Sequence, residues 1–367
     1  MRAAEPKPGE LPLAPLVECS PRAGLSNFIA KAMQGGDLKI AYLGGSITAQ
    51  EGWRPKSLEL FQKEFSNAKL MQINAAIGGT GSDLGVFRLK QDVLDYKPDL
   101  MFVEFAVNDG GQSPEKIYKC MEGIVRQTWK TLPECDICFV YTVTESLIPP
   151  LYEGTMQKSA SAMEKVAEHY GIPTIHLGVE VAKLAKAGTL VLKAAKPKTD
   201  EERKTLEGKT LFSPDGVHPY PETGHELYTQ AIARSLPAIR QASAAGKAHE
   251  LIAPFIAGNY ENAKMIPLAK LKLSPKIVKL DSAKDTIAKR FANRIPNLYR
   301  TNKPGETITF KFKGTYAAIY DIIGPDCGQV TVTLDAEKPA LKPRFDAYCT
   351  YHRMHRIGQI RPNPQRG

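Results

Sequence analysis

The chain has 367 residues, more than one typical hydrophobic core supports, so its length predicts two domains. Hydrophobic residues make up 43% of the sequence and charged residues 24%, as in ordinary globular proteins, and no apolar run approaches the roughly 20 residues that a membrane-spanning helix needs. The net charge of +10 favours acidic partners. No zinc-finger, helix–turn–helix or RNA-binding signature accompanies this charge, so we do not expect nucleic acid as a partner.

Residues 1–35 are expected to form an N-terminal extension. The first 15 residues lack the apolar segment of a signal peptide and read as an unstructured mature terminus, from which a leader could have been removed. We expect a secreted or periplasmic protein, in which Cys327 and Cys349 could pair. The sequence does not indicate an oligomeric state.

Strands and helices alternate between residues 36 and 245. Short apolar runs predict five strands, at 38–44, 70–77, 99–107, 137–143 and 172–177. Helical patterns lie at 54–67, 82–96, 113–132 and 155–171, and a last helix follows the segment that begins at residue 213. Because the strands are almost wholly apolar rather than alternating, they are typical of a parallel sheet buried on both faces. We therefore predict a doubly wound, three-layer α/β domain over residues 36–245.

The pattern changes after residue 250, where short, partly alternating segments rich in β-branched residues are broken by glycine and proline. They predict a smaller all-β domain over residues 250–367, sandwich-like and incomplete, because few strands are visible. Strand character is expected to end soon after Tyr351, and a basic C-terminal tail follows.

Polar motifs follow the predicted strands, where open α/β sheets bind their ligands. Gly44 and Gly45 allow a tight turn after the first strand, so Ser46 can project from the sheet edge. A serine becomes a good nucleophile when a base takes its proton. His218 can be that base, and Asp215, three residues earlier, can hold the imidazole from its other side.

An acyl-transfer site also needs hydrogen-bond donors for the developing oxyanion. The candidates are the backbone N–H of Ser46, the backbone N–H of Gly79 and the side-chain amide of Asn108. These parts together predict a serine hydrolase.

The same residues resemble the sequence blocks of the SGNH (GDSL-type) hydrolases, over roughly residues 36–242. The matching positions are Ser46, Gly79, Asn108, Asp215 and His218. Gly79 is preferred to Gly78 because it stands five residues after Asn74, as in the family block. The chain departs from the pattern with GGSIT in place of GDSL and with Ala106 where glycine is usual, and neither change removes a catalytic group.

The GGSIT form, the GWRP that follows it and the β-rich domain resemble the polysaccharide acetylesterase members. This resemblance implies a serine esterase that removes O-acetyl groups from carbohydrate, with neither a cofactor nor a metal. Trp53, Arg54 and Tyr220 are candidates for lining the substrate pocket, although Trp53 could equally be core and Arg54 a surface charge. Glu104 is either a pocket wall or a buried, hydrogen-bonded carboxylate.

Four alternatives stay open. Within the same chemistry, the chain could be a lipase or thioesterase, although the lysine-rich insertion at 183–210 favours a hydrophilic substrate. The fold could instead serve a non-catalytic carbohydrate-binding protein. The glycines of residues 73–85 suggest a dinucleotide loop, but their spacing differs from the usual fingerprint. A metal held by Asp215, His218 and His225 has no further ligand nearby.

Overall fold

The computed structural model describes residues 11–360. The chain divides into two compact units, unit 1 (Met1–Lys264) and unit 2 (Met265–Gly367). The basic tail expected at the C-terminus lies, from residue 361 on, outside the described residues, as do residues 1–10 of the expected N-terminal extension. No helix in the described part has both the length and the apolar character needed to cross a membrane.

The described residues of unit 1 form a six-stranded sheet with the order β1-β6-β5-β4-β2-β3. Its parallel strands are β2 (Gly36–Gly44), β3 (Ala68–Asn74), β4 (Leu100–Glu104), β5 (Asp136–Tyr141) and β6 (Thr174–His176). These overlap the five predicted strands, and the two-residue β1 (Cys19–Ser20) adds an antiparallel edge. The chain passes from β2 to the edge strand β3 and returns to β4 on the other side of β2. The carboxyl ends of β2 and β4 therefore flank the point where open α/β sheets bind ligands.

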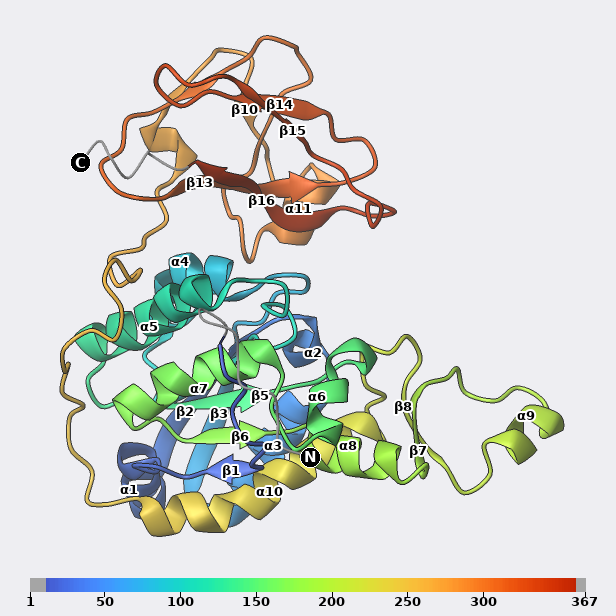
Figure 1. Cartoon of the computed structure of the whole chain (residues 1–367). Coiled ribbons are helices and arrows are strands. Elements are labelled where there is room, and N and C mark those ends of the chain that lie inside the picture. Colours follow the sequence, from blue (N-terminus) through green and yellow to red (C-terminus); the bar gives the residue numbers. More distant parts are fainter. Residues whose placement is uncertain (1–10, 361–367) are drawn as a thin grey trace. The chain divides into compact units, whose positions relative to one another are not determined.

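Helices cover both faces of this sheet (Figure 1). One face carries α1 (Ser26–Gln34), α3 (Trp53–Glu64) and α10 (Gly224–Ala242), and the other carries α4 (Ser82–Asp92), α5 (Pro114–Thr131) and α7 (Lys158–Tyr170). Successive residues of β2 alternate between the two cores, with Tyr42 packing in the first and Leu43 in the second. Both faces are apolar because both are buried, and the predicted three-layer α/β architecture is confirmed.

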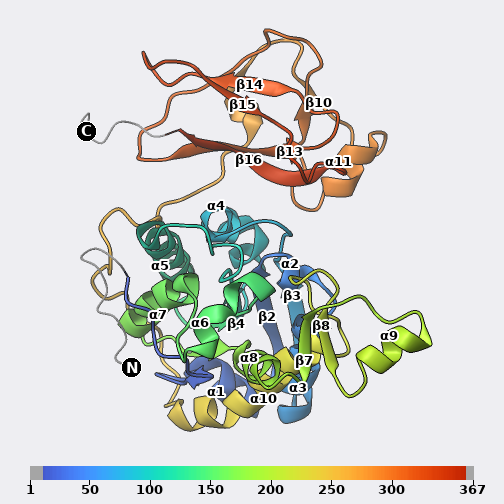
Figure 2. The same cartoon turned by 45° about the vertical axis from the view of Figure 1, so that its right-hand side comes forward.

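The lysine-rich insertion is a structured excursion from this sheet. It consists of α8 (Val179–Lys186), β7 (Leu190–Lys193), α9 (Asp200–Thr205) and β8 (Thr210–Ser213). β7 and β8 pair in parallel as a separate two-stranded sheet, and Figure 2 shows them with α9 projecting beyond α8. β8 ends two residues before Asp215, so the excursion leads directly into the loop that contains Asp215 and His218.

Residues 250–264 differ from the prediction, because they pack on unit 1 and contain no strand. The backbone N–H groups of Phe255 and Ile256 donate to the Glu122 carboxylate at 2.5 and 2.9 Å. Gln127 Nε2 donates to the carbonyl of Tyr260 at 2.8 Å. An irregular segment held by such hydrogen bonds carries no periodic pattern, so its place could not be read from the sequence.

Unit 2 is β-rich, as predicted, but its described strands form two-stranded antiparallel pairs rather than two continuous sheets. The pairs are β9 (Lys272–Leu273) with β12 (Ile308–Thr309), β10 (Val278–Lys279) with β11 (Tyr299–Arg300), β13 (Ala317–Ile323) with β16 (Arg353–Ile360), and β14 (Gln329–Val332) with β15 (Ala340–Pro343). A short helix, α11 (Thr286–Phe291), was not expected; Asp285 caps it by accepting two backbone N–H groups.

The expected loss of strand character after Tyr351 is wrong, because β16 begins at Arg353 and pairs with β13. The arginine and histidine residues of β16 do not form the pattern typical of a strand, and this strand is formed by pairing with β13. Cys327 and Cys349, considered as a disulfide, are both free thiols in the structure.

Candidate active site

The turn that carries Ser46 depends on two close approaches. β2 ends at Gly44, and the short helix α2 (Ser46–Ala49) begins at Ser46. A Cβ atom on Gly44 would lie 2.6 Å from Thr48 Oγ1, and one on Gly45 would lie 1.9 Å from Asn108 Oδ1. Both positions therefore exclude a side chain, which explains the two glycines before the serine.

Ser46, His218 and Asp215 form a hydrogen-bonded chain in the structure. His218 Nε2 lies 2.9 Å from Ser46 Oγ, and His218 Nδ1 lies 2.7 Å from Asp215 Oδ2. Because a carboxylate can only accept, Nδ1 carries the hydrogen, and Nε2 is left to accept the serine hydroxyl proton. Residues 172 positions apart in the sequence thus meet in an arrangement that can activate the serine.

The carboxylate of Asp215 is strongly hydrogen-bonded. Partial burial opposes its ionisation, but the His218 imidazole, the N–H groups of His218 and Val217 (2.8 and 2.9 Å) and the Ser213 hydroxyl (2.9 Å) outweigh it, so the pKa of Asp215 lies well below its usual value. Ser213 was not singled out from the sequence, although its place two residues before the aspartate is typical of such a turn. Asp215 therefore stays ionised at mildly acidic pH.

The other predicted residues approach the same turn. Gly78 and Gly79 lie in the loop after β3, which is tied to the end of β2 by the bond from Ile77 N–H to the carbonyl of Gly44 (3.0 Å). A Cβ atom on Gly78 would stand 3.6 Å from Ser46 Cβ, and Gly79 has a φ of +72°. Asn108 follows β4 and packs on Gly45. The preference for Gly79 over Gly78 as an oxyanion donor stays a prediction.

Gly45→Ala is expected to lower kcat about 10²- to 10³-fold without unfolding the protein. The new methyl group would displace the side chain of Asn108, the predicted oxyanion donor, and loss of one such donor costs about this much. Steady-state kinetics with p-nitrophenyl acetate would measure the effect. Gly111→Ala is the matched control, because a Cβ there meets no atom within 4 Å. A Gly45→Ala enzyme as active as this control would contradict the placement of Asn108.

Trp53 and Arg54 are 0% and 1% exposed, so neither lines a substrate pocket. Trp53 is a core residue, the other alternative left open for it, whereas Arg54 is buried and is not a surface charge. The Trp53 ring packs against Tyr42 and Phe102, at centroid distances of 5.5 and 6.0 Å. Arg54 Nε donates to the carbonyl of Thr48 at 3.1 Å and thus braces α2 from within. Both residues are close to Ser46 in the sequence, but the sequence does not show which face of α3 packs against the core.

Tyr220 is partly buried and connects the His218 loop to the excursion. Its hydroxyl donates to the carbonyl of Ala194 at 3.1 Å, and the ammonium group of Lys196 lies 5.1 Å from its ring centroid. Contact of Tyr220 with a substrate stays a prediction.

His225 is not placed to share a metal ion with Asp215 and His218. Its Nδ1 accepts the backbone N–H of Trp53 at 3.1 Å, and its Nε2 lies 3.2 Å from Gln50 Oε1. Burial, with the nearby positive charge of Lys56, lowers the pKa of His225 to about 4. His225 is therefore a neutral residue that anchors the start of α3, with both ring nitrogens engaged.

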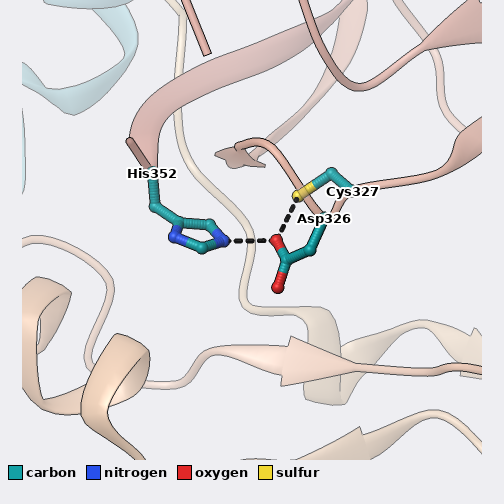
Figure 3. A group of neighbouring side chains, drawn as sticks. All are labelled: Asp326, Cys327 and His352. Atoms are coloured by element: carbon teal, nitrogen blue, oxygen red, sulfur yellow. Dashed lines mark hydrogen bonds and ion pairs between the residues drawn. The ribbon is translucent and has the colours of Figure 1, made fainter. Parts of the chain in front are cut away.

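One group of potential metal ligands occurs among residues 11–360, in unit 2. It consists of Asp326, Cys327 and His352 (Figure 3). His352 Nε2 lies 2.5 Å from Asp326 Oδ1, the distance of a short hydrogen bond. Two such ligands of one tetrahedral zinc would stand about 3.3 Å apart, given metal–ligand bonds of about 2.0 Å. The cluster is arranged as a direct hydrogen bond between His352 and Asp326.

The model of the GDSL-like Lipase/Acylhydrolase family matches residues 42–227. No curated protein matches the chain.

Solved structures with a similar fold include a two-domain esterase active on acetylated mannans. It has a TM-score of 0.68 and 21% identity, over 93% of this chain and 88% of that one. The same kind of esterase co-crystallised with mannopentaose has a TM-score of 0.61 and 21% identity, over 93% and 87% of the two chains. A catalytic mutant of an acetylxylan esterase from Geobacillus stearothermophilus reaches 0.42 and 17% identity, over 55% and 95%.

Proposed function

Because the chain belongs to the GDSL-like lipase/acylhydrolase family and is thereby a carboxylic ester hydrolase, we propose that it is a serine esterase that removes acetyl groups from carbohydrate. The observation that carries this proposal is the hydrogen-bonded chain from Ser46 Oγ through His218 to Asp215. It lies at the carboxyl ends of the strands, where β2 and β4 meet.

In the proposed mechanism Ser46 is the nucleophile. His218 Nε2 takes the hydroxyl proton as Ser46 Oγ attacks the ester carbonyl carbon. The ionised Asp215 holds the imidazole in the required tautomer and stabilises the imidazolium that forms. The backbone N–H groups of Ser46 and Gly79 and the amide of Asn108 would bind the oxyanion.

The tetrahedral intermediate then collapses. His218 returns its proton to the sugar oxygen, which leaves as an alcohol while the acetyl group stays on Ser46. In the second half of the reaction, water attacks the acetyl carbon of the acyl-enzyme while His218 takes its proton. The bond to Ser46 Oγ then breaks, His218 returns the proton to Oγ, and acetate is released. The mechanism needs no cofactor or metal.

A carbohydrate substrate is supported by two observations. The two-domain esterase of similar fold acts on acetylated mannans, and the excursion beside the His218 loop presents lysines and the partly buried Tyr220. A polymeric acetylated carbohydrate is met outside the cytoplasm, so we also propose export. A lipase or thioesterase of the same family is the competing function, and acyl-chain length separates the two.

The proposal is tested with the full chain and two sets of substrates. We expect kcat/KM for p-nitrophenyl acetate to exceed that for the octanoate ester by at least about tenfold, because a small-acyl site has no room for the longer chain. We expect acetate release from acetylated mannan or another acetylated polysaccharide, measured by an enzyme-coupled acetate assay. A preference for the octanoate ester, without acetate release from any acetylated polysaccharide, would favour the lipase or thioesterase instead.

A further inference from the structure

Glu104, the last residue of β4, takes no part in the mechanism above, yet it lies beneath the Ser46 turn. It is 0% exposed, which excludes it as a pocket wall. Its Oε1 accepts the Thr142 hydroxyl at 2.6 Å, and its Oε2 accepts the Thr48 hydroxyl at 2.9 Å. The backbone N–H of Gly45 is a third hydrogen-bond donor to the same carboxyl group.

Two of these donors belong to the turn that presents the nucleophile. Gly45 immediately precedes Ser46, and Thr48 follows it by two residues, so Glu104 contacts the turn on both sides of the reactive atom. The third donor, Thr142, follows the neighbouring strand β5. The carboxyl group thus ties the turn to the interior of the sheet.

The neighbouring glycine fits this connection. Thr48 occupies the space that a side chain on Gly44 would need, since a Cβ there would stand 2.6 Å from Thr48 Oγ1. Arg54 also holds this turn, because its Nε donates a hydrogen bond to the backbone carbonyl of Thr48. Gly44, Thr48 and Glu104 therefore form one connected arrangement.

Burying a carboxyl group is costly, and burial is the main cause that raises the pKa of Glu104, against the hydrogen bonds of Thr142, Thr48 and Gly45, which lower it. An apolar residue of similar volume would avoid this cost. Such an apolar residue would not fix the positions of Gly45 and Thr48. Hydrogen bonds from Gly45, Thr48 and Thr142 to one carboxyl group do fix them. Catalytic groups must be held to within about 0.5 Å, by packing together with hydrogen bonds from the residues that support them.

We propose that Glu104 is a positioning residue, which holds Ser46 Oγ in line with His218 Nε2 by fixing Gly45 and Thr48 on either side of it. This inference rests on the proposed role of Ser46 as the nucleophile.

The first test is Glu104→Gln in the full chain. Glutamine keeps the volume, but its single acceptor oxygen cannot serve all three donors. We expect kcat for p-nitrophenyl acetate to fall about 10- to 100-fold while KM changes less than about threefold, the signature of a misplaced nucleophile. Inactivation by diethyl p-nitrophenyl phosphate, which phosphorylates an activated serine, should slow by a similar factor.

Glu122→Gln is the matched control. Glu122 is also 0% exposed, and it accepts hydrogen bonds from the Tyr170 hydroxyl (2.6 Å) and from two backbone N–H groups, on α5 and away from Ser46. Both variants are expected to lower the melting temperature, because each disrupts a buried carboxyl group. Only Glu104→Gln should lower kcat and the rate of inactivation. Equal kcat values for the two variants, measured well below both melting temperatures, would overturn the proposal.

Thr48 provides the second test, which decides the matter if Glu104→Gln does not fold. Thr48→Val removes the hydroxyl at nearly constant volume, whereas Thr48→Ser keeps it. We expect Thr48→Val to lose kcat about tenfold and Thr48→Ser to recover most of it. Equal kcat values for these two variants would overturn the proposal. Activity that persists in Ser46→Ala would instead remove the proposed function itself, whatever Glu104 does.

Discussion

Replacing Ser46 with alanine is expected to lower kcat/KM for p-nitrophenyl acetate by about 10⁴- to 10⁶-fold, the range found when a serine nucleophile is removed. The hydroxyl lies 2.9 Å from His218 Nε2, and alanine leaves that base with no nucleophile to activate. Residual hydrolysis would come from the oxyanion donors and substrate binding. Because Ser46 opens α2 with its side chain only partly buried, the change should leave the melting temperature nearly unaltered.

Initial rates of nitrophenol release, together with mass spectrometry of the protein after treatment with diethyl p-nitrophenyl phosphate, check this expectation. The wild type should gain one diethyl phosphoryl group, and Ser46→Ala should gain none. Ser146→Ala, which removes the hydroxyl of an exposed serine, is the control and should behave as the wild type. A Ser46→Ala enzyme that retains a tenth of the wild-type rate would contradict the proposed mechanism.

Asp215→Asn is expected to lower kcat about 10³- to 10⁴-fold, with little change in KM. The carboxylate can only accept, so it selects the tautomer in which Nε2 is free to take a proton, while an amide can donate to Nδ1 and favour the other tautomer. The low pKa of Asp215 keeps the carboxylate ionised in mild acid, so its own protonation should not limit activity there.

The measurement is kcat for wild type and Asp215→Asn between pH 5 and 9. The loss should persist across this range, because wild-type Asp215 is ionised throughout. Asp200→Asn is the matched control, since the Asp200 side chain in α9 is 86% exposed. An Asp215→Asn enzyme within tenfold of this control would show that another group orients His218.

The architecture of unit 1 and its family were both predictable from the amino-acid sequence. Five apolar runs predict the five parallel strands because a sheet buried on both faces needs apolar residues at every position. The resemblance read from Ser46, Gly79, Asn108, Asp215 and His218 is confirmed by the family model that matches residues 42–227. These motifs could be recognised because each follows a strand or precedes a helix. The carboxyl ends of parallel strands meet at one edge of the sheet.

The roles of the residues between these motifs became clear from their contacts in the folded chain. Trp53 and Arg54 stand close to Ser46 in the sequence yet turn into the core, and Glu104 proves to be buried under Gly45 and Thr48. Residues 250–264 pack on unit 1 through Glu122, and β16 forms by pairing with β13. In each case the outcome depends on partners far along the chain. The periodicity of apolar residues predicts which face of an element is buried. It does not predict which group, distant in the sequence, a buried polar side chain will contact.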